Sequence, residues 1–383
     1  MTLRSWRQAS GEGSSVTKRR LLVVSPLDIF PPNTGGMRRT YNIIKSLLPR
    51  YDVALACPVL SQPEEQDLPI RVYQLTRPGK RQFLSPRFVR RLRHVIEHEE
   101  PEALIVSFIW AVPAAWLARF PKKIPLYVDT QNVETERLRG AGARWWRLAA
   151  VYERLATHLV DRVWVVSGQD LNLLRQLGMP ERRAVLVPNG YDNEVFFPDL
   201  NAGRAMRESL GITAGERLLL YFGHMGYGPN QEALEALYKH VLPILDRQQI
   251  KYRLVVAGRN SSELAGSYIH QHMLFTGVID RIQDAINAAD AVVVPLLRGG
   301  GTRTKIIESA ACGTPVVSTT AGAAGLDRAA FGELLTIADD WGEFASATVA
   351  LAARPREDRV QPPGFCKQYA WRSVMERLEL DAA

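Results

Sequence analysis

One stretch of the chain combines the residue types that bind a phosphate carrying a polyol. Residues 298–319 read RGGGTRTKIIESAACGTPVVST, in which glycines precede Arg303 and Lys305 and an acid follows at Glu308. Glycine lets an anion approach the backbone closely, and a helix start favours negative charge. Glu308 lies about one and a half helical turns beyond Arg303, where it could accept hydrogen bonds from vicinal hydroxyl groups. A plain helix cap with exposed cations and a solvated glutamate is the alternative.

The surrounding elements place this stretch at a ligand-binding edge. AVVVPL reads as a strand, RGGGT as a loop and RTKIIESAA as the first turns of a helix. In open α/β sheets, ligands bind beyond the carboxyl ends of the strands, where loops run into helices. The spacing excludes a Walker loop, and no GxGxxG follows the first strand.

Both halves of the chain alternate short apolar strands with helices, which predicts parallel sheets covered on both faces. The expected fold class is α/β, with two doubly wound, Rossmann-like domains that face each other across a cleft. The predicted strands are RRLLVVSP, DVALACP, RVYQL, ALIVSF, PLYVDT, RVWVVS, LLLYFG, RLVVAGR, MLFTG, AVVVPL and TPVVST.

Turn-rich segments and a change in charge indicate the domain boundaries. The first half is strongly basic and the second slightly acidic, within an overall formal charge of +8. VPNGYDNEVFFPDL is rich in turn formers and marks the crossing between the domains. The predicted parts are a disordered basic tail at 1–20, a first Rossmann-like domain at 21–187, a linker at 188–200, a second Rossmann-like domain at 201–365, and a helix at 366–383 that packs back toward the first domain.

The composition favours a globular cytoplasmic protein. The 383 residues contain three scattered cysteines and no Cys/His cluster, so neither a disulfide framework nor a structural metal is expected. The first twenty residues lack an apolar core and do not read as a signal peptide. The longest apolar window, residues 104–120, is short for a membrane span and reads better as a strand followed by a helix.

Two arginine-rich amphipathic stretches raise the question of a membrane partner. SPRFVRRLRHVIEHEE and RGAGARWWRLAAVYERL each place arginines beside apolar side chains. Either helix could lie on an anionic membrane surface, or pack its apolar side inward. No motif that reads nucleic acid accompanies the basic residues, so no nucleic-acid partner is expected.

Several segments in order resemble the GT-B-fold glycosyltransferases of family 4, which are retaining and use nucleotide sugars. The similarity covers nearly the whole chain after the tail. The segments that carry it are PPNTGGMRRTYNIIKSLL, VVSGQDLNLLRQLG with VLVPNGYDNEVFFP, LLLYFGHMGYGPNQEALEAL, VVAGRN, FTGVIDRIQDAINAADAVVVPL and the stretch at 298–319.

The resemblance implies a nucleoside-diphosphate sugar as donor substrate, with no cofactor and no metal. It makes 201–365 the nucleotide-sugar donor domain and 21–187 the acceptor domain, whose positive charge fits an acidic or lipid-linked acceptor. It implies that Glu308 contacts the ribose. It places acceptor-side positions at Arg38, Gln131 and Asn132, and a candidate catalytic residue near the phosphates at His224. The donor-binding positions that it implies are Gly35, Gly36, Gly223, Arg259, Asn260, Val278, Gly301 and Thr302.

Four positions depart from the family pattern. The first glutamate of the E-x7-E motif falls at Gly300, and the phosphate-binding Arg and Lys fall at His224 and Pro229. The usual acceptor-side His is Gln131, which cannot titrate. We hypothesise that Arg303 and Lys305 replace the missing charge, as in the subgroup with a G-x-G-T-R-x-K loop.

The expected function is transfer of a sugar from a nucleoside-diphosphate sugar to a glycan, lipid-linked or small-molecule acceptor, with retention. The expected location is cytoplasmic, peripheral at the inner face of the membrane. Two alternatives stay open: a nucleotide-sugar epimerase, and a catalytically weak paralogue that acts as a nucleotide-binding or scaffold subunit. The departures at Gly300, His224, Pro229 and Gln131 keep the second alternative open.

Overall fold

The protein was analysed as a computed structural model. It describes residues 18–32, 34–58, 60, 64, 66–76, 83, 85–140, 142–248, 250–298, 301–378 and 380. Residues 1–17 of the predicted tail and position 300 lie outside the described residues. The first strand begins at Arg19, inside the stretch predicted as tail.

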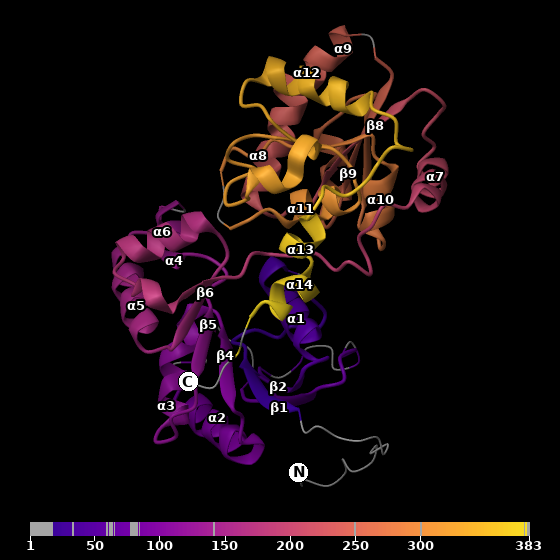
Figure 1. The fold of residues 1–383 in the computed structure, drawn as a ribbon. Coiled ribbons are helices and arrows are strands. Elements are labelled where there is room, and N and C mark those ends of the chain that lie inside the picture. Colours follow the sequence, from indigo (N-terminus) through magenta and orange to yellow (C-terminus); the bar gives the residue numbers. More distant parts are fainter. Residues whose placement is uncertain are drawn as a thin grey trace, which may run out of the picture.

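The first domain is built on a seven-stranded parallel sheet with strand order β3-β2-β1-β4-β5-β6-β7 (Figure 1). Alternate residues of β1 enter two cores, since Leu22 and Val24 pack on one face of the sheet and Leu21 and Val23 on the other. The elements are β1 Arg19–Val24, α1 Gly35–Leu47, β2 Tyr51–Cys57, β3 Arg71–Gln74, α2 Pro86–Glu99, β4 Ala103–Ser107, η3 Ile109–Ala111, α3 Val112–Arg119, β5 Leu126–Asp129, α4 Glu134–Gly140, α5 Trp146–His158, β6 Arg162–Val165, α6 Gly168–Gln176, η4 Glu181–Arg183 and β7 Ala184–Leu186.

The second domain is built on a six-stranded parallel sheet with strand order β10-β9-β8-β11-β12-β13. One large hydrophobic cluster fills it, and the four central strands are buried on both faces, whereas the edge strands β10 and β13 are partly exposed. The elements are α7 Leu200–Ser209, β8 Arg217–Phe222, α8 Gly228–Ala236, a π-helical turn η5 Leu237–Val241, α9 Leu242–Arg247, β9 Tyr252–Ala257, η6 Ser262–Ser267, β10 Met273–Gly277, α10 Ile282–Ala288, β11 Ala291–Val294, α11 Thr304–Ala311, β12 Val316–Ser318, η7 Arg328–Leu334, β13 Leu335–Ile337, α12 Trp341–Ala352, α13 Phe365–Tyr369 and α14 Trp371–Glu376.

These two sheets confirm the predicted fold class, and all eleven predicted strands are present. Two three-residue strands, β7 and β13, were not predicted. Each forms the last strand at one edge of its sheet. A run of three residues carries no readable alternation, so its strand identity comes from pairing with a neighbour.

The chain crosses between the domains twice, and the two crossings are hydrogen-bonded to each other. The Tyr191 amide donates to the Tyr369 carbonyl at 2.9 Å, and the Trp371 amide donates to the Tyr191 carbonyl at 3.0 Å. A Cβ at Gly190 would lie 2.6 Å from the Tyr369 carbonyl oxygen. A side chain at this position would therefore push the two crossings apart.

The last helix packs on the first domain. Trp371, Val374 and Met375 of α14 belong to the same hydrophobic cluster as Ile43 and Leu47 of α1. Figure 1 shows α14, in yellow, beside the indigo α1. The second crossing therefore ends in the core of the domain that begins the chain.

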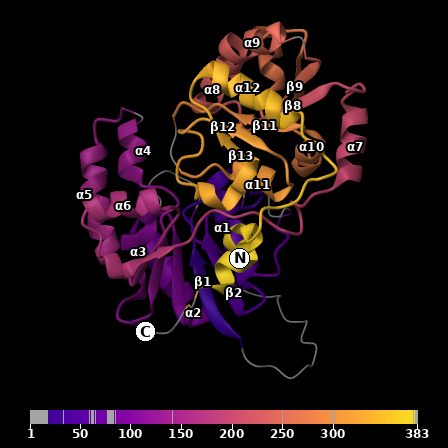
Figure 2. The same ribbon diagram turned by 45° about the horizontal axis from the view of Figure 1, so that its top comes forward.

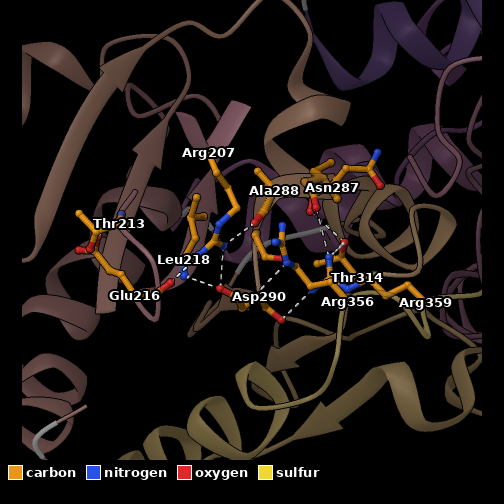
Figure 3. Close-up of polar contacts among 12 residues, drawn as sticks. Arg207, Thr213, Glu216, Leu218, Asn287, Ala288, Asp290, Thr314, Arg356 and Arg359 are labelled. Carbon is orange, nitrogen blue, oxygen red and sulfur yellow. Dashed lines mark hydrogen bonds and ion pairs between the residues drawn. The ribbon is translucent and has the colours of Figure 1, made fainter. Parts of the chain in front are cut away.

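The segment that leads into the second crossing is anchored by a buried carboxylate. Asp290, just before β11, accepts hydrogen bonds from Arg207 Nη1 at 2.8 Å and from the Leu218 amide at 2.7 Å (Figure 3). Arg356 Nε lies 3.6 Å from the same carboxylate, and Arg359 donates to the Asp290 carbonyl at 3.2 Å. The arginines of residues 353–364 thus fix this segment to the second domain.

Among the residues that the structure describes, no helix has both the length and the apolar character needed to cross a bilayer.

Candidate active site

The loop after β8 is shaped for close approach to the backbone. Gly223 has φ +151°, and a Cβ placed there would lie 3.1 Å from Asn230 Nδ2 and 3.2 Å from Lys305 Nζ. A Cβ at Gly258, after β9, would lie 2.1 Å from the Gly223 carbonyl oxygen. The two loops therefore pack backbone against backbone, and the Lys305 amine reaches them from α11.

Lys305 is a partly buried cation held beside this loop. Its Nζ lies 3.3 Å from Asn230 Oδ1, and 4.9 and 5.9 Å from the ring centroids of Tyr221 and Phe222. No carboxylate of the described residues lies within ion-pair distance of it. Burial, reinforced by the nearby Arg303 charge, lowers the pKa of the Lys305 amine to about 7. An anion beside the amine would restore its charge, as a diphosphate does.

Arg303 shapes the loop before α11. Its Nη1 donates to the Gly301 carbonyl at 2.8 Å, and burial lowers the pKa of its guanidinium. Gly301 has φ +70°, so the turn favours glycine at this position. The predicted cations Arg303 and Lys305 therefore lie near each other, but at least one guanidinium nitrogen of Arg303 hydrogen-bonds a carbonyl of its own loop.

Glu308 lies one turn after Lys305 and is buried. Burial raises the pKa of the Glu308 carboxyl, while the charges of Arg38 and Lys305 oppose that rise. Arg38 belongs to the first domain, so these predicted residues from both domains lie within electrostatic reach of one another. A buried carboxyl of this kind is suited to hydrogen-bond a ligand hydroxyl.

Gly35 and Gly36 begin α1, and Gly36 lies against two residues with uncommon backbone conformations, Phe108 and Gln131. A Cβ at Gly36 would lie 2.5 Å from Gln131 Oε1 and 2.8 Å from Phe108 Cζ, whereas Gly35 has open space. Phe108 and Gln131 follow β4 and β5 with φ +68° and +57°. Such conformations in residues other than glycine are uncommon and gather at functional sites. Gln131 Nε2 donates to Thr40 Oγ1 at 3.1 Å, and its Oε1 has no hydrogen-bond partner within the described part of the chain.

The two glycines are expected to respond differently to alanine. Gly36→Ala should lower the free energy of unfolding by about 1–3 kcal/mol, because its methyl group overlaps Gln131 and Phe108. Gly35→Ala should leave stability unchanged or raise it by up to about 1 kcal/mol, since alanine favours the helix. Urea unfolding of both variants measures the difference. Equal losses of stability would contradict this packing.

A buried network that the sequence analysis missed connects the first domain to the donor loop. Arg39 forms an ion pair with Asp129 at 2.7 Å, and both side chains are almost fully buried. Its Nη2 also donates to the Val187 carbonyl at 2.8 Å, and its Nη1 to Asn189 Oδ1 at 2.9 Å. Asn189 Nδ2 donates in turn to Thr302 Oγ1 at 2.7 Å. The network therefore runs from α1 through Asn189, in the first crossing, to Thr302, the residue before Arg303.

The domains also meet directly at Asn132. A Cβ at Gly301 would lie 2.8 Å from Asn132 Oδ1. A Cβ at Gly325, which has φ +77°, would lie 2.9 Å from Thr302 Cγ2 and 3.2 Å from Ser167 Cβ. The predicted acceptor-side Asn132 thus lies against the predicted donor loop.

The other predicted donor-site residues lie in the loops that follow β8, β9 and β10, and they do not contact Lys305. His224 is exposed, and its Nδ1 accepts from the Gly226 amide at 3.3 Å. Asn260 has φ +63° and donates to Glu263 at 3.0 Å, while Arg259 and Val278 are exposed. These side chains lie at the carboxyl edge of the second sheet, where a ligand spanning several strand ends would meet them.

Two family models match the chain. Residues 34–190 match a glycosyl transferase 4-like domain, and residues 216–354 match the glycosyl transferases group 1. D-inositol 3-phosphate glycosyltransferase 2 from Catenulispora acidiphila is 30% identical over 215 residues, 51% of this chain and 48% of the relative. The chain spans about half the length of the curated relatives it matches.

Solved structures share the fold over nearly the whole chain. Sucrose-phosphate synthase from Thermosynechococcus elongatus has a TM-score of 0.71 and 18% identity, covering 94% of this chain and 97% of its own. Anabaena Alr3699/HepE in complex with UDP and glucose has a TM-score of 0.69 and 15% identity, covering 94% and 98%. At these identities the similarity establishes the fold alone.

Proposed function

We propose that this chain, which is built of two glycosyltransferase domains in the GT-B arrangement, transfers a sugar from a nucleoside-diphosphate sugar to an acceptor. The observation that carries the proposal is the partly buried amine of Lys305 beside the Gly223 loop, with no carboxylate of the described residues at ion-pair distance. A cation without a carboxylate partner is costly to bury unless a ligand supplies the anion. A diphosphate does so.

Solved neighbours support the class of donor. Anabaena Alr3699/HepE is described in complexes with UDP and with UDP-glucose. We extend only the class to this chain: a sugar attached to a nucleoside diphosphate.

The chemistry needs charge stabilisation on the leaving group. When the sugar–oxygen bond breaks, negative charge builds on the departing diphosphate, and donors already placed beside it lower the barrier. Lys305 and Arg303 carry this role in our proposal, with the helix start at Gly35 approaching the diphosphate from the other domain. Glu308 holds the ribose. These cations replace a metal, so chelators should leave the rate unchanged.

We further propose membership of the retaining family 4, in the subgroup with a G-x-G-T-R-x-K loop. In that mechanism the leaving phosphate assists deprotonation of the acceptor, which removes the need for an imidazole at Gln131. We place the protein in the cytoplasm, peripheral at the membrane, with an acidic or lipid-linked acceptor.

The deciding experiment supplies a panel of UDP- and GDP-sugars with lipid-linked and soluble acceptors. Transfer yields free nucleoside diphosphate and an acceptor heavier by one sugar residue, whose anomeric proton coupling in NMR should match that of the donor. Conversion of the donor to an isomer without diphosphate release would instead establish an epimerase. Donor binding without either product would establish the scaffold alternative.

A further inference from the structure

Helix α5 presents a stripe of apolar side chains to solvent. Trp145, just before the helix, is 50% exposed, and Leu148, Val151 and Leu155 are 72%, 58% and 61% exposed. Residues at this spacing lie on one side of a helix. We call these four side chains the α5 stripe. Large apolar side chains gathered in this way, rather than scattered singly, mark an interaction surface.

Within residues 142–158 the exposed arginines beside the α5 stripe have no exposed acid among them. They are Arg144, Arg147 and Arg154. On the neighbouring α4, the exposed Glu136 lies 3.9 Å from Arg139. Glu153 is the one acid between residues 142 and 158, and it is buried on the opposite side of the helix. There its carboxylate accepts hydrogen bonds from the amides of Glu134 and Thr135 at 2.7 and 2.9 Å.

Aromatic side chains reinforce the basic rim. The guanidinium carbon of Arg147 lies 5.4 Å from the ring centroid of Trp146, and that of Arg139 lies 5.7 Å from it. The Trp145 ring lies 6.4 Å from that of Trp110 in η3. Trp and Arg together with an apolar stripe are typical of helices that lie in a lipid interface.

The other arginine-rich helix is arranged in the opposite way. The apolar side chains Phe88, Leu92 and Ile96 of α2 are buried in the core of the first domain. From Arg87 onward its exposed side chains are all polar or charged, as on an ordinary surface helix: four arginines, His94, Glu97 and His98. Of the two stretches that the sequence singled out, only the α5 segment therefore has its apolar face uncovered.

A second exposed group lies on the neighbouring helix. Figures 1 and 2 both show α3 beside α5 on the side of the first domain away from α14. The exposed Leu117 of α3 and the exposed Phe120, just after the helix, are followed by the exposed Lys122 and Lys123. The same combination of apolar and basic side chains thus recurs on a helix that neighbours α5.

We propose that α5 is a membrane-docking helix, whose apolar stripe enters the interface of an anionic lipid surface while Arg144 and Arg147 pair with lipid phosphates. Positive charge without exposed acid on this helix favours a lipid surface over a protein partner of mixed charge. Through α4, the helix adjoins Asn132 at the contact between the domains. Docking would therefore hold the acceptor side of the protein near the bilayer. The inference rests on the peripheral membrane location proposed above and assigns it a surface. Its test does not depend on turnover, so its failure would leave the proposed sugar transfer untouched.

The test is cosedimentation of the full-length chain with vesicles of phosphatidylcholine, with and without phosphatidylglycerol. The chain should bind the anionic vesicles, and Trp emission should shift to the blue. Leu148→Ser/Leu155→Ser should weaken the partition coefficient by about tenfold or more, since two leucine side chains no longer leave water. Both positions are well exposed, so the fold should tolerate the change.

A matched pair of charge variants separates docking from general attraction. Arg144→Gln/Arg147→Gln should weaken binding by on the order of tenfold. Arg87→Gln/Arg90→Gln on α2 removes the same charge and should leave binding unchanged. Three outcomes would overturn the proposal: no binding to anionic vesicles at low salt, equal losses in both charge variants, or a dimer in solution that the stripe variant dissolves while vesicle binding is absent.

Discussion

Lys305→Met should lower kcat/KM for the nucleotide-sugar donor by about 10²- to 10³-fold, with kcat falling as well as KM rising. That is the usual cost of removing one preplaced donor from a developing negative charge. Lys305→Arg should recover part of the loss, because it keeps the charge in a different shape. Lys251→Met, an exposed lysine in the same domain, is the control and should behave as wild type.

The same substitution should not destabilise the protein in the absence of nucleotide. Burying an ammonium group disfavours the folded state, so methionine should unfold at the same or a higher urea concentration. A loss of activity without a loss of stability would assign Lys305 to the ligand. Near-normal turnover in Lys305→Met would refute the role given to it.

The lowered pKa of Lys305 also predicts the direction in which the stability of the protein changes with pH. Between about 7 and its usual value of 10.5, the amine is neutral when folded and charged when unfolded. The unfolded state then binds more protons, so this group makes the stability of the nucleotide-free protein rise with pH across that window. A diphosphate binds the charged amine, so stabilisation by nucleotide should shrink across the same window in wild type but not in Lys305→Met.

Arg39→Met should lower the free energy of unfolding by about 3–5 kcal/mol, because it leaves the Asp129 carboxylate buried without its cation. It also removes the hydrogen bond that holds Asn189, and with it the support of Thr302. Urea unfolding measures the loss. Arg19→Met, which breaks a partly exposed ion pair with Glu102, should cost no more than about 1 kcal/mol.

The milder Asn189→Ala separates the two roles of the network. It keeps the Arg39–Asp129 ion pair but disconnects Thr302 from the first domain. We expect near-normal stability together with a raised KM for the donor. If Arg39→Met cost no more stability than Arg19→Met, or if Asn189→Ala left KM unchanged, the network would not couple the domains to the donor loop.

The sequence was sufficient for features that depend on local pattern. Continuous apolar runs predicted the long strands, and parallel topology then placed Gly223, Asn260 and Thr302 at one sheet edge, because the carboxyl ends of parallel strands share that edge.

Long-range pairing could not be predicted in the same way. Arg39 and Asp129 are ninety positions apart, and each reads as an ordinary surface charge until the fold buries both. Helical periodicity shows that α2 and α5 each have an apolar face, but only the packing shows that the face of α2 is covered and that of α5 is not. The short strands β7 and β13 likewise depend on their neighbours.

Thermal unfolding of wild type and Glu308→Ala with UDP, GDP and their common sugar derivatives tests the donor site most directly. The account predicts a rise in Tm with one nucleotide series, which Glu308→Ala abolishes because the buried carboxyl no longer holds the ribose. Absence of any shift at millimolar nucleotide in wild type would contradict the donor site and leave the fold without the proposed activity.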